Sequence, residues 1–182
     1  MKLTRKYWLI ILITPVMVAL DQVTKAFIHS ALTPYVTTVT LIPDYLNIIH
    51  VQNTGMAFSL FTGRFGGYGI WVFPLITLFA LGIIVYLFSR AQDDAIILPA
   101  ALSFVLAGAL GNNLIDRLHW GYVVDFIQMG YGGHYWPIYN VADISITIGI
   151  VLLILDSFRP QPKLGPEPKP VEQVPLGGAG ES

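Results

Sequence analysis

Long runs of apolar residues without a charged side chain constrain the fold of this 182-residue chain more than any other feature. No Asp, Glu, Lys or Arg occurs in the 25 residues between Arg64 and Arg90, or in the 21 residues between Asp94 and Asp116. A helix needs about 20 apolar residues to cross the hydrocarbon core of a bilayer. Charged residues make up 12% of the chain, about half the usual share for a soluble domain. These runs therefore indicate transmembrane helices.

The apolar runs predict an all-α integral membrane protein with four transmembrane helices. The spans are expected at about residues 7–28, 68–89, 95–117 and 137–158. Four spans place both termini on one side, together with most of the basic residues: Lys2, Arg5, Lys6, Arg90, Arg159, Lys163 and Lys169. By the positive-inside rule, both termini are expected in the cytoplasm.

The two outer connections differ in character. Residues 33–62 are β-rich, because two strand-like runs, 36–42 and 46–52, flank a Pro-Asp turn. A small extracytoplasmic hairpin or sheet is expected there. Residues 119–138 hold four glycines and several aromatic residues, a composition typical of a mobile loop at the membrane interface.

The rest of the composition excludes several classes of protein. Cysteine is absent, so disulfides, thiolate metal sites and a cysteine nucleophile are excluded. The net charge of −1 gives no basic surface for nucleic acid. Residues 160–182 are rich in Pro and Gly and are predicted to be a disordered cytoplasmic tail. Residues 1–159 are expected to form one domain.

Polar residues within or beside the apolar spans are functional candidates, because ionisable groups at membrane depth are costly. All of them fall on the outer half of the predicted bundle: Asp21, Lys25, Asn53, Asn113, Asp116, Arg117, Asp125, Asn140 and Asp143. One end of the bundle is therefore expected to hold the chemistry.

Several of these residues also have a purely structural interpretation. Asp21 and Lys25 stand four apart on a helix and could simply pair with each other. Asn113, Asp116 and Arg117 share a helical face by spacing, and Asp116 could hold Arg117 or a backbone amide. A stripe of small residues in the third span is expected to pack closely on another helix: Ser103, Ala107 and Gly111.

Asp125 and Asp143 favour a catalytic interpretation. Asn140 and Asp143 could cap the fourth helix, although Asp143 is expected to lie a turn inside it. Asp125 follows Val123-Val124 in an apolar stretch, where a solvated carboxylate is hard to explain. Two close carboxylates tend to share one proton, so one can activate water while the other polarises a carbonyl.

Other catalytic sets are missing. The sequence contains no HExxH zinc motif, no GxSxG elbow and no phosphate-binding glycine loop. The four histidines lack the spacing of metal ligands. Acid–base chemistry by aspartate remains, and neither a metal nor a cofactor is expected.

Five short segments together resemble the lipoprotein signal peptidases (signal peptidase II). They are DQVTK (21–25), NTGMAF (53–58), GNNLIDR (111–117), VVDF (123–126) and YNVAD (139–143). The resemblance covers about residues 7–158. It implies a multi-pass aspartyl endopeptidase of the bacterial inner membrane, with its active site toward the periplasm. Such an enzyme removes signal peptides from lipidated prolipoproteins before a diacylglyceryl-modified cysteine.

The resemblance also suggests roles for individual residues. Asp125 and Asp143 match the catalytic pair, while Asp21, Lys25 and Asp116 match supporting groups. Residues expected to line the substrate site are Asn53, Asn113, Arg117 and Asn140. Asn112 replaces a usual Gly and Tyr139 replaces a common Phe; neither is expected to touch the acids. A monomer in contact with membrane lipid is expected.

Two other functions compete with this interpretation. A small proton-coupled transporter subunit would use the acids as a relay, but the acids cluster on one side and no inverted repeat is visible. A membrane scaffold without enzymatic activity would need the aspartates only for stability.

Overall fold

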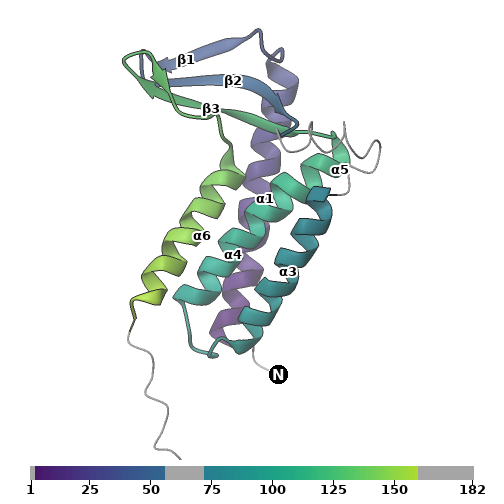
Figure 1. The fold of residues 1–182 in the computed structure, drawn as a ribbon, viewed down its shortest axis with the longest axis vertical. Coiled ribbons are helices and arrows are strands. Elements are labelled where there is room, and N and C mark those ends of the chain that lie inside the picture. Colours follow the sequence, from purple (N-terminus) through teal and green to yellow (C-terminus); the bar gives the residue numbers. More distant parts are fainter. Residues whose placement is uncertain (1–2, 56–71, 160–182) are drawn as a thin grey trace, which may run out of the picture.

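The computed structural model describes residues 3–55 and 72–159, which form a helical bundle with a small sheet at one end (Figure 1). The helical elements are α1 Arg5–Ala31, α3 Val72–Arg90, α4 Ile97–Ala109, the π-helical turn η2 Leu110–Asp116, α5 Arg117–His119 and α6 Val141–Ser157. Helix α1 begins and α6 ends at the end of the bundle opposite the sheet. All four predicted helices are present.

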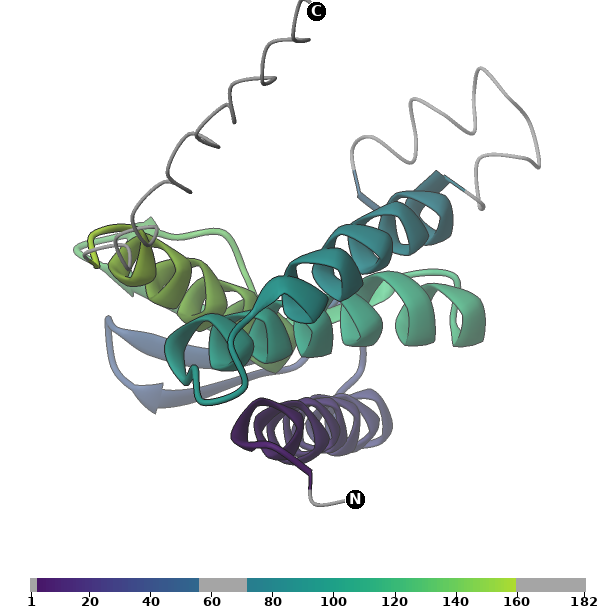
Figure 2. The same cartoon turned by 90° about the horizontal axis from the view of Figure 1, so that it is seen from below.

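Helix α4 occupies the centre of the bundle, with α1, α3 and α6 around it (Figure 2). The outward faces are apolar: the side chains of Val23, Phe27 and Phe79 are 68%, 68% and 73% exposed. Within the described residues, two helices are long and apolar enough to cross a membrane, α1 and the continuous stretch Ile97–His119. Helix α6 has only 17 residues, so the length criterion alone does not establish four spans.

The predicted stripe of small residues lies at the contacts of α4 and η2 with α1 and α6. Ser103 is buried, and its carbonyl oxygen accepts a hydrogen bond from Thr14 Oγ1 of α1 at 3.2 Å. A Cβ on Gly111 would lie 2.6 Å from Asp21 Oδ2. Only a residue without a side chain therefore fits at this position, and the packing interpretation is confirmed.

The sheet has four antiparallel strands in the order β1-β2-β3-β4. The strands are β1 Thr38–Ile42, β2 Leu46–Asn53, β3 Val123–Tyr131 and β4 His134–Tyr135. The predicted hairpin of β1 and β2 is confirmed, and Asp44 takes a positive φ of 65° in its turn. Asp125 of β3 lies opposite Val51 of β2.

The prediction of a mobile loop over residues 119–138 is wrong, because this segment contains β3. The first four residues of β3 are buried, and Val124 and Phe126 pack against Ile28 of α1. Strand β2 supplies the hydrogen-bonding partner that the local sequence could not reveal. Three of the glycines that suggested mobility lie on either side of the strand and adopt positive φ: Gly121, Gly132 and Gly133.

Three expectations fall partly or wholly outside the described residues. They are the start of the second span at 68–71, the end of the β-rich segment at 56–62, and the cytoplasmic tail at 160–182.

Candidate active site

Lys25 is the centre of a buried ionic cluster at the sheet end of the bundle. Its ammonium donates hydrogen bonds to Asp21 Oδ2 at 2.7 Å and Asn112 Oδ1 at 2.6 Å, and it forms an ion pair with Asp116 Oδ2 at 2.7 Å. The Lys25 side chain is 0% exposed, so these three oxygen partners compensate for the loss of water.

The same cluster joins three helical elements. Asp21 Oδ1 accepts a hydrogen bond from the backbone N–H of Ala142 in α6 at 2.9 Å. Gln22 Nε2 donates to Asp116 Oδ1 at 2.8 Å. The predicted pair of Asp21 and Lys25 is confirmed. Asp116 is an anchor as expected, and its side chain contacts Lys25 and Gln22.

Asp125 is a buried carboxylate on β3, with 3% of its surface exposed. Asn53 Nδ2 donates to its Oδ2 at 2.7 Å, and Asn140 Nδ2 donates to its Oδ1 at 2.6 Å. Burial raises the pKa of Asp125 to about 6, with a smaller increase from the nearby charge of Asp143, while the two asparagine amides oppose the increase. Asp125 can therefore hold a proton at a mildly acidic pH.

Asp143 lies in the first turn of α6, where it forms a capping box with Asn140. The Asp143 backbone N–H donates to Asn140 Oδ1 at 3.1 Å, and the Asn140 backbone N–H donates to Asp143 Oδ2 at 3.1 Å. The capping interpretation is therefore correct, and the expectation that Asp143 lies a turn deeper is wrong. Asn140 contacts both carboxylates, so one residue links Asp125 to Asp143.

Two asparagines at this site have a fixed amide orientation. The Oδ1 atom of Asn53 accepts from the Gly55 backbone N–H at 2.8 Å, and Oδ1 of Asn140 accepts from the Asp143 backbone N–H. A backbone N–H can only donate. Each NH₂ group must therefore face the other way, toward Asp125.

A hollow of about 410 Å³ opens beside Asp125. Its lining comes from the end of β2, the residues after it and the approach to α6: Val51, Gln52, Asn53, Thr54, Gly55, Asp125, Pro137 and Ile138. Arg117 Nη1 donates to the Thr54 carbonyl oxygen at 3.1 Å and so supports one wall. The hollow exposes backbone and amide groups next to a carboxylate.

The expectation that Asn112 does not touch the acids is wrong. Asn112 Nδ2 donates to Asp143 Oδ1 at 2.7 Å, and the side chain of Tyr139 instead bonds Met129. Asn113 is half-buried, and its side chain makes no hydrogen bond to the described residues. Asn112 and Asn113 stand four and three residues before Asp116, and both spacings share a helical face, so the spacing did not show which asparagine contacts the acids.

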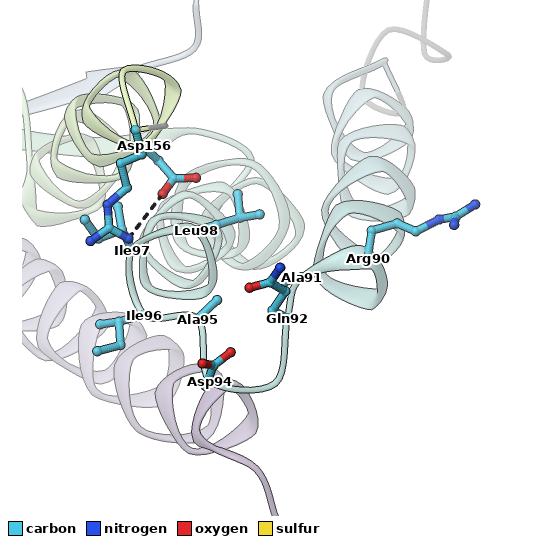
Figure 3. Close-up of a pocket in the computed structure, with 10 residues that line it drawn as sticks. Arg90, Ala91, Gln92, Asp94, Ala95, Ile96, Ile97, Leu98 and Asp156 are labelled. Carbon is cyan, nitrogen blue, oxygen red and sulfur yellow. Dashed lines mark ion pairs between the residues drawn. The ribbon is translucent and has the colours of Figure 1, made fainter. Parts of the chain in front are cut away.

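A second hollow, of about 510 Å³, lies at the opposite end of the bundle, between the α3–α4 connection and the end of α6 (Figure 3). Asp156 and Arg159 form an ion pair there at 3.9 Å. The side chain of Arg90 points away from this hollow (Figure 3). None of the predicted site residues lines it.

Comparison with known proteins agrees with the site geometry. A profile of the family described as signal peptidase (SPase) II matches residues 13–159. The chain belongs to the signal peptidase II family. Among its relatives, the lipoprotein signal peptidase of Pseudomonas paraeruginosa is 43% identical over 148 residues, 81% of this chain and 86% of the relative. That of Listeria welshimeri is 37% identical over 147 residues, 81% and 91% of the two chains.

Solved structures support the same membership. A bacterial membrane enzyme determined by the in meso method at 1.9 Å resolution has a TM-score of 0.72 and 36% identity, covering 84% of this chain and 94% of that chain. A second, at 2.3 Å, has a TM-score of 0.70 and 37% identity, covering 81% and 86%. The fold of these membrane enzymes thus extends over most of this chain.

Seven of the nine residues that the signal peptidase II resemblance pointed to fall into two connected groups, and Asn113 and Arg117 are the other two. Asp125, Asp143, Asn140 and Asn53 form one hydrogen-bonded network. Asp21, Lys25 and Asp116 form the other. Sequence reasoning missed Asn112, which joins the two groups. The only local signal was the pair of adjacent asparagines, and their spacing could not tell which one faces the acids.

Proposed function

We propose that this chain is an aspartic endopeptidase of the bacterial inner membrane that removes signal peptides from prolipoproteins, cutting before a diacylglyceryl-modified cysteine. Two observations support the proposal: the relatives are named lipoprotein signal peptidases, and the sheet end of the bundle carries two linked carboxylates. No metal or cofactor enters the mechanism.

The observation that carries the proposal is the link through Asn140. Its side-chain amide bonds Asp125, and its backbone and Oδ1 bond Asp143. The carboxylates come from a strand and a helix, and a single residue holds both. Because neighbouring carboxylates resist simultaneous ionisation, the pair retains one proton over a range of pH.

The proposed reaction needs one ionised and one protonated aspartate. The ionised carboxylate takes a proton from water as the water oxygen bonds the scissile carbonyl carbon. The protonated carboxyl donates a hydrogen bond to the carbonyl oxygen. When the C–N bond breaks, the leaving amine takes a proton from the dyad, and the signal peptide leaves as a carboxylate. Asn53, Asn113, Arg117 and Asn140 are proposed to bind the extended peptide, and Asn53 among them lines the hollow beside Asp125.

The proposed membrane placement has four spans, cytoplasmic termini and a periplasmic active site. The apolar outward faces of the helices support lipid contact. The site lies at the sheet end, opposite the start of α1 and the end of α6. A substrate that is itself a membrane helix could present its cleavage point at that depth while its acyl chains stay in lipid. We propose that the enzyme acts as a monomer.

The test compares purified wild type, Asp125→Asn and Asp143→Asn in detergent. Each is mixed with a diacylglyceryl-modified prolipoprotein and with the same precursor lacking the lipid, and a gel shift reports release of the signal peptide. We expect wild type to cleave only the lipidated precursor. Both variants should lose at least about 1,000-fold in rate, in the range seen when members of an aspartate-containing catalytic set are removed.

Matched controls separate loss of chemistry from loss of folding. Asp156→Asn changes a carboxylate on the same helix as Asp143, and Asp44→Asn changes one in the β1–β2 turn. Both should cleave at the wild-type rate. Normal cleavage by Asp125→Asn and Asp143→Asn would refute the dyad, and a wild type that never cleaves would refute the proposed activity.

A further inference from the structure

Asn112 connects the buried ionic cluster to the carboxylate pair. In the described part of the chain it is the one side chain that hydrogen-bonds both Lys25 and Asp143, at 2.6 Å and 2.7 Å. It lies in η2 and is buried. Through Asn112, the turn η2 joins Lys25 of α1 to Asp143 of α6.

The direction of this contact is fixed by chemistry. The Lys25 ammonium can only donate, so Asn112 must turn Oδ1 toward it. The NH₂ group then faces Asp143 Oδ1. Asn53 and Asn140 follow the same rule at Asp125, because each has its Oδ1 held by a backbone N–H. Three asparagines therefore each present an amide donor to one of the two aspartates.

An amide NH₂ beside Asp143 Oδ1 has two consequences. It favours the ionised carboxylate, because a hydrogen bond to the charged form stabilises that form. It also keeps a proton off Oδ1, since two donors facing each other leave no acceptor. Together with the Asn140 backbone N–H on Oδ2, it fixes the orientation of the carboxylate.

We propose that Asn112 is a positioning residue for Asp143, held in direction by Lys25. The inference rests on the proposed peptidase function. It assigns to the Lys25 cluster a part in catalysis in addition to its part in stability. Asn113, one position along, is its natural comparison, because its side chain makes no hydrogen bond to the described residues.

The test measures kcat, KM and the pH profile of Asn112→Ala, Asn112→Asp and Asn113→Ala with the lipidated precursor. Asn112→Ala should lower kcat about 100-fold, the effect of misplacing a reacting group by about 1 Å, with KM within about threefold. Losing a donor disfavours the ionised pair, so the acidic limb of the kcat profile should move to higher pH. Asn113→Ala removes a residue proposed to bind the peptide, so it should change KM, without moving that limb.

Asn112→Asp separates positioning from folding. The new carboxylate keeps an acceptor for Lys25, so the variant should fold. It replaces the amide donor by an oxygen against Asp143 Oδ1, so kcat should still fall about 100-fold. Asn47→Asp is the control, because Asn47 bonds Gln128 on the sheet; its kcat should stay within about twofold of wild type.

A second readout needs no substrate. Infrared titration of the carboxyl bands, assigned with Asp143→Asn, should show a displaced Asp143 titration in Asn112→Ala and an unchanged one in Asn113→Ala. Suppose wild type cleaves, but Asn112→Asp folds with full kcat, or Asn113→Ala moves the acidic limb as far as Asn112→Ala does. The inference is then overturned while the peptidase function stands. If wild type does not cleave and only Asn112→Ala displaces the titration, the peptidase function fails and the contact with Asp143 stands.

Discussion

The two ends of the helical bundle hold their charged residues in opposite surroundings. At the sheet end, Lys25 Nζ lies 2.7 Å from Asp21 Oδ2 and 2.7 Å from Asp116 Oδ2, and each of the three side chains is at most 1% exposed. At the other end, Lys6 pairs with Asp93 at 2.9 Å, but the Asp93 side chain is 67% exposed. The Asp156–Arg159 pair there is longer, at 3.9 Å.

The difference shows which end of the bundle carries ion pairs buried at both partners. Removing ions from water costs several kcal/mol each, and a buried cluster persists only if its partners are complete. Solvent-exposed pairs carry little of that cost and contribute little in return. Among the described residues, ion pairs with both partners buried occur only at the end that carries Asp125 and Asp143.

Removing the central cation should have the largest effect. Lys25→Met leaves two buried carboxylates without their shared donor, so the free energy of unfolding should fall by about 3–5 kcal/mol. Lys6→Met removes a buried cation, but its partner Asp93 is 67% exposed and keeps its contact with water, so the loss should be smaller. Thermal unfolding of both variants in detergent measures the contrast, and equal losses would remove the distinction between the two ends.

The pH dependence of stability should give the next largest effect. Burial raises the pKa of Asp125 from 3.8 to about 6, so the folded protein binds this proton more tightly than the unfolded chain. The resulting stabilisation is complete below about pH 3.8 and is lost as pH rises through about 6, up to about 3 kcal/mol in all. Asp125→Asn cannot lose a proton. Its melting temperature relative to wild type should therefore rise between pH 4 and about 7, and a constant difference would contradict the raised pKa.

Two glycines give a smaller contrast in packing. A Cβ at Gly111 would lie 2.6 Å from Asp21 Oδ2, whereas one at Gly82 in α3 meets nothing within 4 Å. Gly111→Ala should destabilise by about 1–3 kcal/mol, as overpacking does. Gly82→Ala should stabilise by up to about 1 kcal/mol, because alanine favours the helix. Melting temperatures in detergent measure both effects. An unchanged melting temperature in Gly111→Ala would show that the ionic cluster can shift.

The sequence predicted the elements whose signals are local. Apolar run lengths located the helices, and a turn between two β-branched runs located the β1–β2 hairpin. Asp125 was recognisable because a lone carboxylate in an apolar stretch needs a partner. The sequence also predicted that Asn140 and Asp143 cap the last helix. In the structure they cap it, and Asn140 also bonds Asp125.

The features that sequence reasoning missed depend on distant partners. Strand β3 forms because β2 lies beside it. The two strands are separated by the 69 residues 54–122 of the sequence. The π turn η2 has no local signature, since its residues would equally suit an α-helix. Asn112 could not be distinguished from Asn113 without the positions of Lys25 and Asp143.

The hydrogen bond from Ala142 to Asp21 joins residues 121 positions apart, which has a consequence for biosynthesis. At about 5–20 residues per second, a ribosome needs roughly 6 to 25 seconds to synthesise that interval. Until Asp116 is synthesised, the carboxylate partner of Lys25 is Asp21, one turn away on its own helix. The first helix can thus enter the bilayer as a self-neutralised pair. Asn140 and Asp143 arrive later, with the last helix, so the network around Asp125 can close only once that helix is made.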